Sequence, residues 1–238
     1  MVGLPAHAAG HESPAGLPAG DALAARLHAA LPQTQCTRCG FADCAAYAQA
    51  IAAGEAPINQ CPPGGADGIA RLSIITGLPT QALNPSHGIE GPRAVAVIDE
   101  AWCIGCTLCM KVCPTDAVLG SNKRMHTVIE PYCTGCDLCI PVCPVDCISL
   151  VNVTGERTGW SAWSEAQASQ ALERYDARRA RLKRAARDPA RAMEHKAQAE
   201  LADLPGRTDG ADGAEAERKK AVIAAAMEKA RARRGVAG

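Results

Sequence analysis

Twelve of the thirteen cysteines in this chain of 238 residues fall into three groups with short, regular spacings. Cysteine thiolates hold metal ions and iron–sulfur clusters, or pair as disulfides. Disulfides require an oxidising compartment, and the N-terminus has neither the basic nor the apolar region of a secretory signal peptide. We therefore expect these cysteines to bind metal.

The second and third groups are two copies of the motif Cys-x2-Cys-x2-Cys-x3-Cys-Pro, offset by 30 residues. This motif is typical of bacterial two-cluster ferredoxins. Three closely spaced cysteines wrap one [4Fe–4S] cluster, while the fourth lies too far along to reach it and crosses to the other cluster. The motif therefore predicts site 2, with Cys103, Cys106, Cys109 and Cys143, and site 3, with Cys113, Cys133, Cys136 and Cys139. Zinc is the alternative for such pairs, but zinc sites rarely need the third cysteine and the proline.

The first group has the looser spacing Cys-x2-Cys-x4-Cys-x16-Cys-Pro. Four thiolates within 26 residues suit one further [4Fe–4S] cluster. This group predicts site 1, with Cys36, Cys39, Cys44 and Cys61. Zinc is a stronger alternative here than at sites 2 and 3, although the neighbouring ferredoxin motif favours a cluster.

Several residues beside the motifs receive narrower interpretations. Gly105 and Gly135 precede the second cysteine of each run, where glycine permits positive φ and a close approach of backbone to cluster. Cys147 takes the place of Ala117 in the repeat, and we interpret it as a small buried residue, with a spare ligand or a redox thiol as the alternative. Trp102 precedes the first cysteine of its run, as Tyr132 does in the other, and both can shield a cluster or simply pack. The six histidines have no ligand spacing, and we assign them no role.

The elements that carry these groups indicate an α+β fold. It consists of a small helical Fe–S domain, a bacterial two-[4Fe–4S] ferredoxin-like domain and an Ala/Arg-rich helical C-terminal extension. The predicted regions are a disordered leader at 1–20, the Fe–S domain at 21–80, the two-cluster domain at 92–155 and the basic extension at 160–238.

Helices are predicted at 21–31, with Asp21 as N-cap, at 44–53, closed by Gly54, and at 68–76. Strands are predicted at 94–99, 118–119, 126–130 and 148–153. Within the extension we expect helices at 163–187 and 215–234, with Pro189 beginning another segment. Because the extension holds no cysteine, truncation at Gly159 should leave all the sites intact.

Zero net charge hides an uneven distribution. From Glu156 onward, 18 Lys and Arg face 13 Asp and Glu, a net charge of +5, so residues 1–155 carry −5. This modest excess over 83 residues, interspersed with acids, favours a solvated helix over a nucleic-acid-binding arm. No apolar run approaches the length of a membrane span, and no phosphate-binding loop or nucleophile motif is present.

The segments Thr34–Cys44 and Gly54–Gly65, followed by the two-cluster motif, resemble the B subunit of the Rnf (Rsx) electron-transport complex. The resemblance covers roughly residues 21–155 and lacks the N-terminal membrane helix typical of that family. It implies a subunit on the cytoplasmic face of the inner membrane, with redox proteins and membrane subunits as partners, in a complex that couples electron flow to ion transport.

We therefore expect an electron carrier with three [4Fe–4S] clusters and no catalytic site of its own. Whether it is a subunit of an ion-translocating oxidoreductase is left open at this point. With four thiolates per cluster and few basic residues nearby, the potentials should be low, on the order of −400 mV or below. One alternative is a free-standing cytoplasmic polyferredoxin that serves a soluble reductase. A third hypothesis, an Fe–S protein that binds nucleic acid, rests only on the basic tail.

Overall fold

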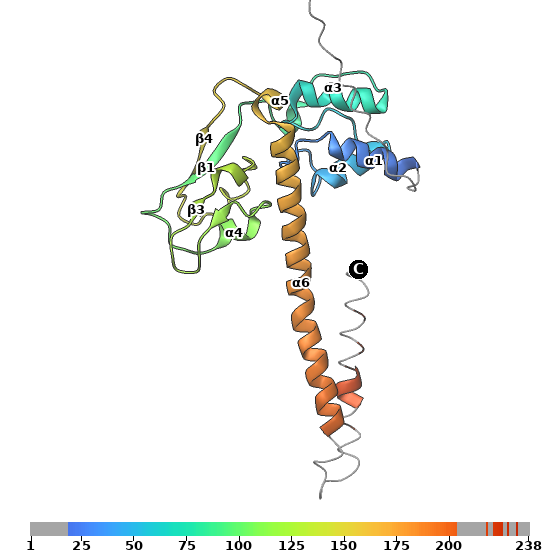
Figure 1. Cartoon of the computed structure of the whole chain (residues 1–238), viewed down its shortest axis with the longest axis vertical. Helices are drawn as coiled ribbons and strands as arrows, with labels where there is room; N and C mark the ends of the chain where they lie inside the picture. The colour runs from blue at the N-terminus through green and yellow to red at the C-terminus, as the bar shows by residue number, and fades with distance from the viewer. Residues whose placement is uncertain (1–18, 204–217, 219–220, 226–227, 229–231, 233–238) are drawn as a thin grey trace, which may run out of the picture. The chain divides into compact units, whose positions relative to one another are not determined.

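The computed structural model describes residues 19–203, 218, 221–225, 228 and 232, and the side chains of 188–203 are not described. The chain divides into two compact units, 1–176 and 177–238. Figure 1 shows the order of the elements along the chain. The predicted mixture of helices and short strands is confirmed.

Three short helices form the N-terminal part of the first unit: α1 (Ala19–Ala29), α2 (Cys44–Ala52) and α3 (Gly65–Thr76). The Asp43 side chain caps α2 by accepting from the Ala46 N–H at 2.7 Å, and Gly54 follows the helix at φ 75°. Leu27, Tyr47, Ile58 and Leu72 are among the residues that fill the core between them. This small core holds the loops that carry the first cysteine group.

Two predicted helix starts are wrong. Helix α1 begins at Ala19, so Asp21 lies in the first turn instead of at the N-cap, where its charge still complements the helix dipole. Helix α3 begins at Gly65, three residues before the predicted start, because the turn at Gly64 already has helical backbone angles. Of the predicted leader, residues 1–18 lie outside the described residues.

The two-cluster region is built on two antiparallel pairs of strands. Strand β1 (Ala94–Ile98) pairs with β4 (Ile148–Asn152), which brings the ends of the region together. Strand β2 (Val118–Leu119) pairs with β3 (Thr127–Val128), which joins the two cysteine runs. The short helix α4 (Leu108–Val112) lies within the first run. Single-turn 3₁₀ helices, η1 (Pro85–His87) and η2 (Glu130–Tyr132), complete the connections.

The chain then forms α5 (Gly159–Ala162) and the long helix α6 (Glu165–Asp203). Helix α6 runs on through Pro189, so the prediction that this proline begins a new segment is wrong. The predicted helix at 215–234 falls largely outside the described residues. Among the residues that are described, no helix combines the length and apolar character that a membrane span requires.

The beginning of the predicted extension belongs to the first unit. Trp163 is only 5% exposed and forms a small core with Ala168 and Ala171, against which Trp160 packs. The Trp163 indole N–H donates to the Pro32 carbonyl at 2.8 Å. Residues 159–176 are therefore packed against the part of the chain that carries the cysteines.

Candidate metal centres

Site 1 is formed by the loop before α2 and by the turn that leads into α3. Gln33, Gln35 and Thr37 all have positive φ, between 53° and 58°, and alternate left-handed residues turn successive N–H groups towards an anion. The buried Gln35 side chain accepts from the Cys44 N–H at 3.0 Å and so joins this loop to α2.

The four thiols of site 1 lie close enough to repel one another when ionised. Burial raises the pKa of Cys61, and the charges of Cys44, Cys36 and Cys39 raise it further, while the Gly64 N–H acts in the opposite direction. Burial likewise raises the pKa of Cys44 to about 12. Without a cation the thiols of Cys44 and Cys61 hold their protons, and a bound metal would supply the charge that ionises them.

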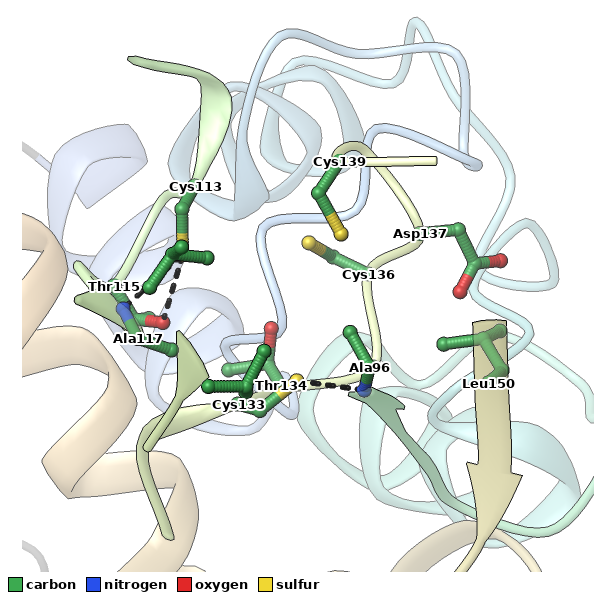
Figure 2. A pocket seen from close by; sticks show the side chains of 13 residues that line it. Ala96, Cys113, Thr115, Ala117, Cys133, Thr134, Cys136, Asp137, Cys139 and Leu150 are labelled. Carbon is green, nitrogen blue, oxygen red and sulfur yellow. Dashed lines mark hydrogen bonds between the residues drawn. The ribbon is translucent and has the colours of Figure 1, made fainter. Parts of the chain in front are cut away.

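Site 3 lies in a cavity lined by Cys113, Cys133, Cys136 and Cys139, together with apolar residues such as Ala96, Ala117 and Val118. Figure 2 shows the sulfurs of Cys136 and Cys139 pointing towards one another. The Ala96 N–H donates to Cys133 Sγ at 3.4 Å, and the Ala117 N–H donates to Cys113 Sγ at 3.2 Å (Figure 2). Burial raises the pKa values of Cys136 and Cys139 to about 12.

Site 2 lies in a second cavity, lined by Cys103, Cys106, Cys109 and Cys143. The backbone N–H of His126 donates to Cys103 Sγ at 3.4 Å. Burial raises the pKa of Cys109, and the charges of Cys106 and Cys103 add to the effect. The structure thus brings together the same four cysteines that the spacing of the motif groups into site 2.

Both cavities combine three cysteines of one run with the fourth cysteine of the other. The predicted crossing of Cys113 and Cys143 therefore agrees with where the structure places these residues. Their binding of clusters stays a prediction. Four buried or half-buried thiols around an apolar cavity, with backbone N–H groups aimed at sulfur, fit the needs of a [4Fe–4S] cluster.

The two glycines inside the runs are required by close contacts. Gly105 and Gly135 have φ of 68° and 67°, in the region that favours glycine. A Cβ at Gly105 would overlap the backbone of Arg124, and a Cβ at Gly135 would overlap the Ala94 carbonyl oxygen. The glycines thus let each cysteine loop pack tightly against a neighbouring segment.

Sites 1 and 3 are neighbours in space. The Thr134 hydroxyl, next to Cys133, donates to the Thr34 carbonyl at 3.0 Å. Arg38, between two site 1 cysteines, forms an ion pair with Asp137, between two site 3 cysteines. The charge on Cys109, of site 2, contributes to raising the pKa of Cys139, of site 3. Site 3 therefore adjoins both site 1 and site 2.

The start of α6 reaches the loops of both cysteine regions. The Arg174 guanidinium lies 3.5 Å from the centroid of the Tyr132 ring and donates through Nε to the Thr115 carbonyl at 2.7 Å. The Tyr175 hydroxyl hydrogen-bonds to Asp43 Oδ2 at 3.0 Å. Tyr132 thus packs under an arginine, whereas Trp102 is 70% exposed and does not shield its site.

His126 lies beside these sites although its spacing in the sequence predicts no role for it. Its side chain is only 1% exposed, and its Nδ1 lies 3.4 Å from Cys109 Sγ. The repeat contains a signal for it, since the 30-residue offset matches His126 with Ala96. Cys147, which the same offset matches with Ala117, lies with its sulfur 3.6 Å from Cys143 Sγ.

Cys143 and Cys147 influence each other's ionisation. Burial raises the pKa of Cys143, but N–H groups of Val145, Cys147 and Asp146 and the Cys147 thiol outweigh it, so the pKa is lowered. Burial and the neighbouring Cys143 raise the pKa of Cys147 to about 12. In the part of the chain that the structure describes, no three His, Cys, Asp or Glu side chains are arranged to hold a single metal ion.

Two known families match the segments that carry the cysteines. Residues 96–150 match the family described as a 4Fe-4S dicluster domain, and residues 31–63 match the one described as a putative Fe-S cluster. These matches cover the three sites and support iron–sulfur clusters as their cofactors.

Several curated proteins, each named as the B subunit of an ion-translocating oxidoreductase complex, are similar to this chain. One from an Azoarcus species is 56% identical over 110 residues, which are 46% of this chain and 60% of the relative. One from Thiobacillus denitrificans is 54% identical over 110 residues, which are 46% of this chain and 58% of the relative. One from Alkalilimnicola ehrlichii is 54% identical over 143 residues, which are 59% of this chain and 76% of the relative. The chain thus spans about three-fifths of the length of the first two.

Proposed function

We propose, since this chain belongs to the family of the B subunits of ion-translocating oxidoreductase complexes, that it carries electrons through three [4Fe–4S] clusters within such a complex. The observation that carries the proposal is the gathering of twelve cysteines into three sets of four. Three of the four cysteines are buried at sites 1 and 3 and one of the four at site 2, and sites 2 and 3 each enclose an apolar cavity.

When bound, a [4Fe–4S] cluster accepts and releases one electron at a time. The chain's own residues hold the cluster, exclude water and adjust its charge balance. Backbone N–H groups of Ala96 and Ala117 donate to the sulfurs of site 3, which stabilises negative charge there. No residue of the three sites is proposed as a nucleophile or proton donor, so partners carry the chemistry.

The proposed partners are redox proteins and the membrane subunits of an Rnf-type complex. The protein would lie on the cytoplasmic face of the inner membrane. Its electron donor would meet one end of the row of sites and its acceptor the other.

Metal and sulfide analysis of the anaerobically purified protein tests the cofactor. Three clusters require about 12 iron and 12 acid-labile sulfide per chain, from four of each per cluster. Stoichiometric zinc with little sulfide would instead establish zinc sites and refute the proposal. About eight of each would show that one of the three sites does not hold a cluster.

An anaerobic pull-down at low salt, with the membrane fraction retained, tests the place of the protein in a complex. Recovery with integral membrane subunits is the expected result. Recovery with soluble enzymes alone would instead establish a free-standing polyferredoxin that serves a cytoplasmic reductase.

A further inference from the structure

The internal repeat gives sites 2 and 3 equivalent backbone hydrogen bonds to sulfur. Its 30-residue offset matches His126 with Ala96. Their backbone N–H groups make equivalent hydrogen bonds to the first cysteine of a run. The His126 N–H donates to Cys103 Sγ and the Ala96 N–H donates to Cys133 Sγ, each at 3.4 Å. The two sites therefore differ mainly in the side chains at matching positions.

At this position site 3 has a methyl group and site 2 has an imidazole. His126 Nδ1 lies 3.4 Å from Cys109 Sγ and 3.7 Å from Cys103 Sγ. A thiolate that binds iron has no proton, so the ring must be the donor in this contact, through Nδ1–H. The glycine at position 120 leaves room for the ring, because a Cβ there would overlap it.

A second matched pair differs in the same direction. Cys147 matches Ala117, and the N–H groups of both donate to the crossing cysteine, Cys143 or Cys113. The Cys147 side chain adds a thiol whose sulfur lies 3.6 Å from Cys143 Sγ. Both His126 and Cys147 line the cavity of site 2, whereas Ala96 and Ala117 line that of site 3.

We propose that His126, assisted by Cys147, raises the reduction potential at site 2 above that at site 3. The inference rests on the proposed function, since it requires clusters at both sites. Reduction adds negative charge that spreads onto the cysteine sulfurs, and hydrogen-bond donors to those sulfurs stabilise the reduced form. A tenfold preference of the electron for site 2 corresponds to about 59 mV for a one-electron couple. His126 is thus a positioning residue that makes the two halves of the repeat unequal.

Anaerobic redox titration of the full, cluster-loaded chain, followed by electron paramagnetic resonance, measures these potentials. The wild-type protein should titrate with unequal potentials at the two repeat sites. His126→Ala with Cys147→Ala copies the residues of site 3 into site 2, and the two potentials should converge by roughly the shift that corresponds to tenfold, about 59 mV. His126→Leu fills the space of the ring without a hydrogen-bond donor and should lower the potential of site 2 alone. His126→Gln keeps an N–H donor, so the potential of site 2 should fall by less.

Labelling with ¹⁵N-histidine gives a second readout that a purely structural role would not produce. The reduced wild-type protein should show a nitrogen hyperfine coupling at one cluster, and His126→Leu should abolish it. Full iron and sulfide content with unchanged potentials in both His126→Ala and His126→Leu would overturn the inference. Equal potentials at the two sites in the wild type would also overturn it, even where the variants fail to assemble. Absence of iron and sulfide from the wild type would instead refute the proposed function.

Discussion

Trp163→Ala should loosen the packing that joins the start of the C-terminal segment to site 1. The Trp163 side chain is almost fully buried and donates to the Pro32 carbonyl at 2.8 Å. The Arg93 guanidinium lies 4.9 Å from the centroid of its ring. Truncation of a buried tryptophan costs about 3–5 kcal/mol, through lost burial, the cavity left behind and the unsatisfied carbonyl. This is a large share of the roughly 5–15 kcal/mol of a typical domain.

Cluster loss makes unfolding irreversible, so the effect is best measured as a rate. The assay follows anaerobic bleaching of the visible absorbance at a fixed denaturant concentration. If the Trp163 contacts break in the rate-limiting opening, about 3 kcal/mol corresponds to at least roughly a hundredfold faster bleaching. Pro32 lies four residues before Cys36, so site 1 should lose its iron first.

Trp102→Ala is the matched control, because Trp102 is 70% exposed and also adjoins a site cysteine. It should change stability by no more than about 0.5 kcal/mol, as exposed substitutions usually do. Equal bleaching rates for the two variants would refute the reasoning.

Two further predictions concern the ferredoxin region. Cys113→Ser should damage the cluster held with Cys133 and Cys136 and leave that of its own run in place; selective loss of the latter, seen by electron paramagnetic resonance, would contradict the crossing. Gly135→Ala should lower the iron content by about a third, because the added Cβ would overlap the Ala94 carbonyl oxygen. Gly54→Ala is the control, since Gly54 has a similar φ but open space around it. It should lower the free energy of unfolding by only about 1–2 kcal/mol and retain all the iron. Similar iron contents in the two glycine variants would show that the overlap is relieved by movement of the loop.

The cysteine sets follow from the sequence because short spacings limit what a chain can reach. Two repeated runs fix which three cysteines share a cavity, and reach alone assigns the fourth to the other run. The strands at 118–119 and 148–152 were also predictable from β-branched runs at the ends of the motifs. Local chemistry therefore determines the sites and the elements next to them.

Contacts between distant segments could not be predicted in the same way. The bond from Trp163 to Pro32 joins residues 131 apart, and no spacing rule connects them. Arg174 binds a backbone carbonyl, at Thr115, and every residue offers such a carbonyl. Composition therefore indicated a separate basic extension, whereas the first compact unit runs to Asp176.

His126 shows a different limit, since the information was present in the repeat. A search for ligand spacing among the histidines could not find it, because it lies beside the ligands instead of among them. Comparison of the two halves position by position would have shown a histidine where the other half has alanine. A strand was predicted to begin at this residue, but β3 begins at Thr127.

The order of the sites in space gives this asymmetry a direction. Thr134 and Asp137 of the site 3 loop both contact the site 1 loop, and site 3 also adjoins site 2. A higher potential at site 2 would draw an electron away from site 1 towards the far end of the row. Trp102 and Ile104, which adjoin Cys103 in the sequence, are among the exposed apolar residues beside site 2.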